Sequence, residues 1–264
     1  MRLAPLVIFA LAGCPPRQTT PVGARPQQQQ QQQQQPVYQP PWPTEAPPPA
    51  SANADVPIDP AAPMPAQSLS TNATLELGKP TSVVIDGRAD IFSSGLAAPD
   101  ASRGGKLPAQ ITLVTNGGYL TFSRVRGKIG CGAGESAGPD GGTCAGGDTD
   151  ILAANGISGI VDHQRTQFVV GVFLGTSTSV RAPARLDFSK EATGESFAEL
   201  TPLLGQTFFI GDGMTPSGLN QRFVVPPNAT RFYIGFADAI GFQGPPGAYA
   251  DNTGGVSVTL TQAR

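Results

Sequence analysis

The sequence is short of the charged and metal-binding residues that many active sites and nucleic-acid-binding surfaces require. Only 14% of its 264 residues are charged, and 17 Lys and Arg against 19 Asp and Glu give a formal net charge of −2. The basic residues are scattered singly along the chain, which argues against a nucleic-acid partner. One histidine and three cysteines are too few for a metal site built on several histidines, so any metal site must use oxygen ligands.

Helical periodicity and long apolar segments are also missing. No window keeps apolar residues at helical spacing over three turns, and the best candidate, 195–204, predicts one short helix at most. Instead, 33 glycines and 27 prolines divide the chain, and between them stand short runs rich in β-branched and aromatic residues. This pattern predicts an all-β fold, an antiparallel β-sandwich or jelly roll, as one domain over residues 67–264. The predicted strands are 82–85, 111–114, 119–122, 168–174, 207–210, 222–225, 231–237 and 255–260.

The first 66 residues differ in composition from the rest. One arginine precedes a short apolar run that ends in Leu11-Ala12-Gly13-Cys14. This pattern resembles a bacterial lipoprotein signal, with an ordinary secretory signal as the alternative. By that resemblance, residues 1–14 are a signal peptide, and a lipid on Cys14 anchors the chain to a membrane of the bacterial cell envelope; Pro15 favours the outer membrane, on either of its sides. Residues 15–66 are rich in proline and glutamine and predict a disordered tether.

Two cysteines and a serine motif lie in one glycine-rich segment of the β domain. In an exported protein, Cys131 and Cys144 are expected to form a disulfide, with two free thiols as the alternative. The run Gly134-Glu135-Ser136-Ala137-Gly138 matches the Gly-x-Ser-x-Gly motif of serine hydrolases. The glycines and proline after it cannot begin the helix that the motif requires, and His163 is too near in sequence to be the base of that fold. We therefore predict that the protein is not an enzyme.

The strongest functional signal is a glycine-rich hairpin near the end of the sequence. Asp238 ends one predicted strand, and Asp251 and Asn252 precede the last one, so three oxygen-bearing side chains are expected at one end of a hairpin. Carboxylate, amide and carbonyl oxygens are the ligands that Ca²⁺ prefers, and the pattern predicts a calcium site. The alternative is a simple turn over 251–254, in which the Asp and Asn side chains bond to nearby backbone.

These residues resemble the PA-IL-like, calcium-dependent galactose-binding bacterial lectins, which are small jelly-roll β-sandwiches. The match consists of Asp238 and the loop Pro246-Gly247-Ala248-Tyr249-Ala250-Asp251-Asn252-Thr253-Gly254. The resemblance implies that calcium is bound by the side chains of Asp238, Asp251 and Asn252 and by the carbonyl of Ala248. It also implies a galactose-like glycan as the ligand. The residues that we assign to glycan binding are Asp238, Phe242, Gln243, Tyr249 and Asp251.

In the lectin hypothesis, calcium keeps two coordination positions for adjacent sugar hydroxyls. Asp238 and Asp251 then accept hydrogen bonds from those hydroxyls, and Phe242 or Tyr249 packs on the apolar face of the sugar. A second class of function stays open, a structural or adhesion module in which calcium only stabilises the sandwich.

Two weaker features complete the sequence-based predictions. Asp140 together with the acidic stretch 146–150 is a candidate for a second calcium loop, with a solvated loop as the alternative. The run Asp90-Ile91-Phe92-Ser93-Ser94-Gly95 looks like an early strand of the lectin family.

Overall fold

The computed structural model describes residues 71–132, 134–177 and 181–264 of the chain. All of them belong to one compact unit, 62–264. The predicted signal peptide, the lipidation site Cys14 and the predicted tether over 15–66 lie outside the described residues. Among the residues described, no helix has both the length and the apolar character needed to cross a bilayer.

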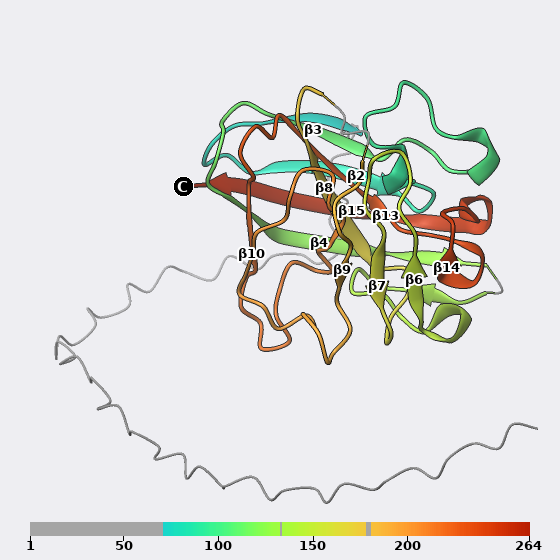
Figure 1. The fold of residues 1–264 in the computed structure, drawn as a ribbon. Helices are drawn as coiled ribbons and strands as arrows, with labels where there is room; N and C mark the ends of the chain where they lie inside the picture. Colours follow the sequence, from blue (N-terminus) through green and yellow to red (C-terminus); the bar gives the residue numbers. More distant parts are fainter. Residues whose placement is uncertain (1–70, 133, 178–180) are drawn as a thin grey trace, which may run out of the picture. The chain divides into compact units, whose positions relative to one another are not determined.

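The described residues form an all-β structure, as the sequence predicts. Three sheets account for its strands (Figure 1). The first sheet has the order β1 (Asn72–Leu75), β3 (Ala109–Leu113), β13 (Arg231–Phe236), β8 (Val169–Leu174) and β11 (Phe208–Phe209). The second has the order β10 (Glu199–Leu200), β12 (Arg222–Val224), β4 (Tyr119–Cys131), β15 (Asn252–Ala263) and β2 (Thr81–Asp86), with β5 (Ser136–Ala137) also paired to β4. The third has the order β14 (Gln243–Gly244), β6 (Thr149–Ile151), β7 (Ile160–Asp162) and β9 (Leu186–Asp187).

The first two sheets pack against each other through aromatic side chains and form a β-sandwich. The Phe122 ring of β4 lies 6.2 Å from the Phe232 ring of β13, and the Phe208 ring of β11 lies 5.4 Å from the Phe223 ring of β12. Strand β8 is buried along its whole length, which its uninterrupted apolar sequence predicts. At Gly171 of β8, an added Cβ would lie 2.7 Å from the Phe232 ring, so this strand needs a glycine where the rings approach it.

Each of the eight predicted strands is present with shifted ends, and the structure adds seven strands that were not predicted: β1, β5, β6, β7, β9, β10 and β14. The predicted helix at 195–204 does not form, because Pro202 interrupts the segment and its short strand β10 pairs with β12 instead. Strand β4 continues to Cys131, well beyond its predicted end. Strand β15 pairs with it over the whole distance, from Asn252 opposite Cys131 to Ala263 opposite Tyr119. The ends of β4 and β15 therefore meet where the predicted calcium site begins.

Short parallel pairings also occur beside the antiparallel ladders. Strand β1 pairs parallel with β3, β10 with β12, β14 with β6, and β7 with β9. These additions lie at the edges of the sheets, whereas the long pairings of β4, β15, β8 and β13 are antiparallel.

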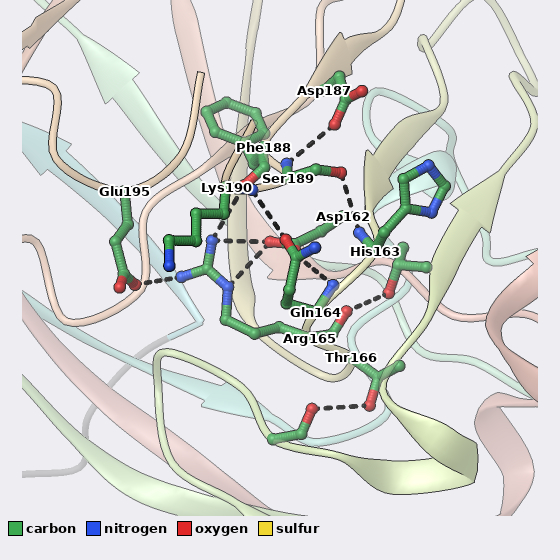
Figure 2. A network of polar contacts seen from close by, with 12 residues as sticks. Asp162, His163, Gln164, Arg165, Thr166, Asp187, Phe188, Ser189, Lys190 and Glu195 are labelled. Atoms are coloured by element: carbon green, nitrogen blue, oxygen red, sulfur yellow. Dashed lines mark hydrogen bonds and ion pairs between the residues drawn. The ribbon is translucent and has the colours of Figure 1, made fainter. Parts of the chain in front are cut away.

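One arginine joins the loop after β7 to the loop after β9 (Figure 2). The Arg165 guanidinium bonds to Asp162 Oδ2 at 2.7 and 2.9 Å, to the Phe188 carbonyl at 3.3 Å and to Glu195. It also lies 4.4 Å from the centroid of the Phe209 ring. The Asp162 side chain is fully buried, and burial raises its pKa although Arg165 acts in the opposite direction. Arg165 is therefore the charge partner that allows a carboxylate to stay in the interior here.

A candidate metal centre at the C-terminal hairpin

The candidate site lies where β13 ends and β15 begins. Asp238 follows β13, and Asn252 is the first residue of β15. The chain between them forms two short 3-10 turns, Ile240–Phe242 and Tyr249–Asp251, and the Gly247 N–H donates to the Asp238 carbonyl at 2.9 Å. Ala248 has φ = 66°, the left-handed region that non-glycine residues rarely enter. This irregular backbone lets the hairpin loop bring Asp238 and Asn252 close together.

The structure brings Asp238 and Asn252 into direct contact in the interior. Both are nearly fully buried, and Asn252 Nδ2 donates to Asp238 Oδ2 at 2.7 Å. Asp238 Oδ1 accepts from the Ala239 N–H at 2.7 Å. The second atom of the Asn252 amide, Oδ1, is buried without any hydrogen-bond partner. A buried acceptor left unpaired costs about 1–3 kcal/mol, so this oxygen marks a position that a donor or a cation would stabilise.

Negative charge is concentrated around the same two residues. The pKa of Asp238 is raised from 3.8 to about 7, mainly by burial; the nearby carboxylates of Asp251 and Asp90 act in the same direction, and the hydrogen bonds from Asn252 and Ala239 act against it. Asp251 is exposed, whereas Asp238 and Asp90 are buried. In the absence of a cation, the centre therefore holds the Asp238 proton up to about neutral pH.

Tyr249 is a structural part of the centre and offers no ring face to a sugar. It is fully buried, its hydroxyl donates to the Phe236 carbonyl at 3.0 Å, and it accepts from the Asp238 N–H at 3.2 Å. Burial, with the charges of Asp90 and Asp238 added, raises the Tyr249 pKa well above its usual value. Phe242 is buried as well. The predicted stacking of Phe242 or Tyr249 on a sugar is therefore wrong for this structure, because both rings serve the interior.

Gln243 is, like Asp251, an exposed member of the predicted sugar-binding set. Its Nε2 donates to Asp148 Oδ2 at 2.8 Å, and Asp148 Oδ1 bonds to His163 Nδ1 at 2.8 Å. The bond to Asp148 raises the pKa of His163. This surface chain of three side chains connects the hairpin loop to the loops that flank β6 and β7.

The acidic residues of the second candidate calcium loop do not share a site. Asp140 Oδ1 accepts from the Asp212 N–H at 2.7 Å, Asp148 binds Gln243 and His163, and Asp150 pairs with Arg185. Each carboxylate has a different partner, so the predicted convergence is absent among these residues.

The run 90–95 contributes to the centre in a way that the sequence does not predict. Instead of an early strand, residues Ile91–Ser93 form a 3-10 turn that Asp90 caps through the Phe92 N–H. Asp90 Oδ2 also accepts from Ser93 Oγ at 2.7 Å and from Arg103 Nη1 at 3.2 Å. Asp90 forms a bridge with Phe236 at the end of β13, which places its buried carboxylate beside the hairpin. The weak similarity over 90–95 was the one sequence signal that pointed to this segment.

The cysteine segment lies against the hairpin from the other side. Cys131 and Cys144 are joined in a disulfide, and Cys131 is the register partner of Asn252. At Gly132, an added Cβ would lie 2.9 Å from Asp251 Oδ2. The sulfur atoms and the Glu135 carboxylate come within 4.8 Å of one another, but both cysteines are used by the disulfide, so they supply no thiolate ligand.

The Gly-x-Ser-x-Gly motif lacks the backbone of a nucleophile elbow. Ser136 is in β5, where Gly130 is its register partner, and residues 138–142 form turns and bridges instead of a helix. The His163 ring bonds to Asp148. The run Gly134 to Gly138 thus matches the serine hydrolase motif in sequence, but its described residues lack the strand-turn-helix geometry of those enzymes.

Comparison of the sequence with protein-family models and with curated proteins finds no match for this chain.

Proposed function

We propose that this protein is a calcium-dependent carbohydrate-binding lipoprotein of the bacterial cell envelope, with its metal centre at the hairpin of Asp238, Asp251 and Asn252. The observation that carries the proposal is the buried, unpartnered Asn252 Oδ1 beside the buried Asp238 carboxyl. Two further carboxylates lie near: Asp251 adds negative charge at this place, and the charge of Asp90 is paired with Arg103. A bound cation would stabilise these groups, because without it a buried acceptor is left unpaired beside a carboxyl.

The donor set fits calcium. Its members are the carboxylates of Asp238 and Asp251, the amide oxygen of Asn252 and the carbonyl of Ala248, all of them oxygens. Calcium takes six to eight such ligands and tolerates irregular geometry, whereas softer metals prefer nitrogen or sulfur. When bound, calcium supplies open coordination positions that adjacent sugar hydroxyls can occupy.

The protein's own residues then orient the sugar. Asp251 is the exposed carboxylate of the set and can accept a hydroxyl hydrogen bond, whereas the buried Asp238 is not accessible to a sugar hydroxyl. Gln243 is exposed and is held in place by Asp148. Ile240, 85% exposed on the same loop, offers the apolar contact that the buried rings of Phe242 and Tyr249 cannot offer. The galactose-type preference is proposed from the lectin resemblance.

Removing the Asp251 carboxylate tests the proposal directly. In calcium, we expect the wild-type domain to bind galactose-type glycans, and we expect EDTA or Asp251→Ala to abolish this binding, as measured by titration calorimetry. Glu199→Ala, which removes an exposed carboxylate from edge strand β10, should leave binding unchanged. If calcium raises the melting temperature but no sugar binds, the structural or adhesion module is the correct function.

Calcium binding should also depend on pH in a defined direction. Because the pKa of Asp238 is about 7, a proton competes with the cation below that pH. We expect the calcium Kd to weaken by about tenfold for each pH unit below 7 and to level off above it. Calorimetry between pH 5 and pH 8 measures this slope, and a Kd that is constant over that range would contradict the place of Asp238 in the centre.

A further inference from the structure

A cleft of about 400 Å³ adjoins the candidate metal centre. It lies between the end of β4, the turn into β5 and the start of β15. Its side chains are those of Lys128, Glu135, Ser136, Asp251 and Thr253, and glycines form the rest of its wall. Its volume is within the range of about 300–1,000 Å³ that small-ligand sites occupy.

Glycines keep this cleft open. An added Cβ at Gly130 would collide with Thr253 Oγ1, and one at Gly132 would lie 2.9 Å from Asp251 Oδ2. The walls are held by backbone bonds: the Glu135 N–H donates to the Gly132 carbonyl at 3.1 Å, and the Cys131 N–H donates to the Glu135 carbonyl at 3.3 Å. The disulfide to Cys144 fixes the same turn. The cleft is therefore a preformed feature of the fold.

Asp251 belongs to both the cleft and the metal centre. It lines the cleft, and it directly precedes Asn252, whose side chain contacts Asp238. The next residue, Asn252, stands opposite Cys131 in the β4–β15 ladder. The cleft therefore lies next to any ligand that Asp251 holds at the metal centre.

The chemistry of the cleft favours a neutral, hydroxyl-rich group. Ser136 and Thr253 supply hydroxyls, Glu135 and Asp251 supply carboxylates, and Lys128 supplies a single ammonium group. Two carboxylates against one ammonium disfavour anionic sugars, while hydroxyls on a ligand can both donate to the carboxylates and accept from the ammonium.

We infer that the cleft is a second sugar subsite, and that the natural ligand is a neutral oligosaccharide of at least two residues. This inference rests on the proposed function. The terminal residue binds at the metal centre, and the next residue lies in the cleft against Glu135 and Ser136.

The test compares one sugar residue with two. We expect the wild type in calcium to bind the best of a panel of neutral galactose-terminated disaccharides about tenfold more tightly than methyl galactoside, as expected for one or two net hydrogen bonds. Glu135→Ala and Ser136→Ala should remove this gain but leave the Kd values for calcium and for methyl galactoside unchanged. Glu199→Ala is the control and should keep the gain.

The outcomes separate this inference from the proposed function. Equal affinities for methyl galactoside and every disaccharide, or a gain that both cleft variants keep, would overturn the second subsite and leave the metal centre intact. A protein that binds calcium but none of the sugars would overturn both. Melting temperatures of the two variants show whether they are folded, which is expected because both side chains are exposed.

Discussion

In the absence of calcium, Asp238→Asn is expected to be more stable than the wild type at pH 8, by about 4 kcal/mol. The pKa of Asp238 is raised from 3.8 to about 7, so the native state holds its proton more tightly than the unfolded state does. The stability that this proton provides is complete below pH 4 and is lost as the pH rises through 7. Asparagine keeps the shape of the buried group and has no charge to lose, and its amide N–H can donate to the unpartnered Asn252 Oδ1 once the Asn252 amide turns over.

The same substitution should abolish calcium binding at useful concentrations. Loss of a partner that only supports a metal ligand costs about 10–100-fold in affinity, and loss of a charged ligand should cost at least as much. Denaturant unfolding at pH 5 and pH 8, with and without calcium, measures both effects. Asp251→Asn is the matched control: its side chain is exposed, so it should weaken calcium binding without the gain in stability. An Asp238→Asn protein that is less stable at pH 8 and still binds calcium would refute this assignment.

Arg165→Ala is expected to destabilise the domain by about 3 kcal/mol, because it leaves the buried Asp162 without its cation and removes a contact with Phe209. For a domain of this size, that corresponds to a fall in melting temperature of roughly 6–12 °C. The Glu195 carboxylate, which the same guanidinium binds, is much more exposed than Asp162. Most of the loss in stability should therefore come from the broken contacts with Asp162, and little from those with Glu195 (Figure 2).

A second arginine provides the control for this prediction. Arg185 pairs with Asp150, and both side chains are about two-fifths exposed, at 39% and 42%. Because exposed ion pairs contribute about 0–1 kcal/mol, Arg185→Ala should change the melting temperature little. If both substitutions lowered the melting temperature equally, the contacts of Arg165 would contribute no more stability than an exposed ion pair does.

The strands were predictable because their sequences are locally consistent. The uninterrupted apolar run of β8 and the β-branched run of β2 indicate strands by themselves. The end of β4 was not predictable, since its glycine-rich sequence gives little local preference and its partner, β15, comes more than a hundred residues later.

The candidate site was predictable in part for the same reason. Asp238, Asp251 and Asn252 stand at the two ends of one hairpin, and the chain can return them to one place through local turns. Sequence gives no information about which ring faces the interior, so Tyr249 was assigned to the sugar although its hydroxyl holds the loop. The contribution of Asp90 was missed because it depends on a bridge to Phe236, far along the chain.

The position of Asn252 at the start of β15 determines when the centre can form during folding. Strand β15 pairs with β4 and β2, and the hydroxyls of Ser82 and Thr259, 177 residues apart, meet at 2.8 Å across the β2–β15 pair. Such distant pairings close slowly. Local turns bring Asp238 and Asn252 together, but Asn252 is fixed only when β15 has paired with β4 and β2, so we expect the proposed calcium site to be complete only in the folded domain. We therefore expect calcium at this proposed site to slow unfolding and to leave the folding rate unchanged.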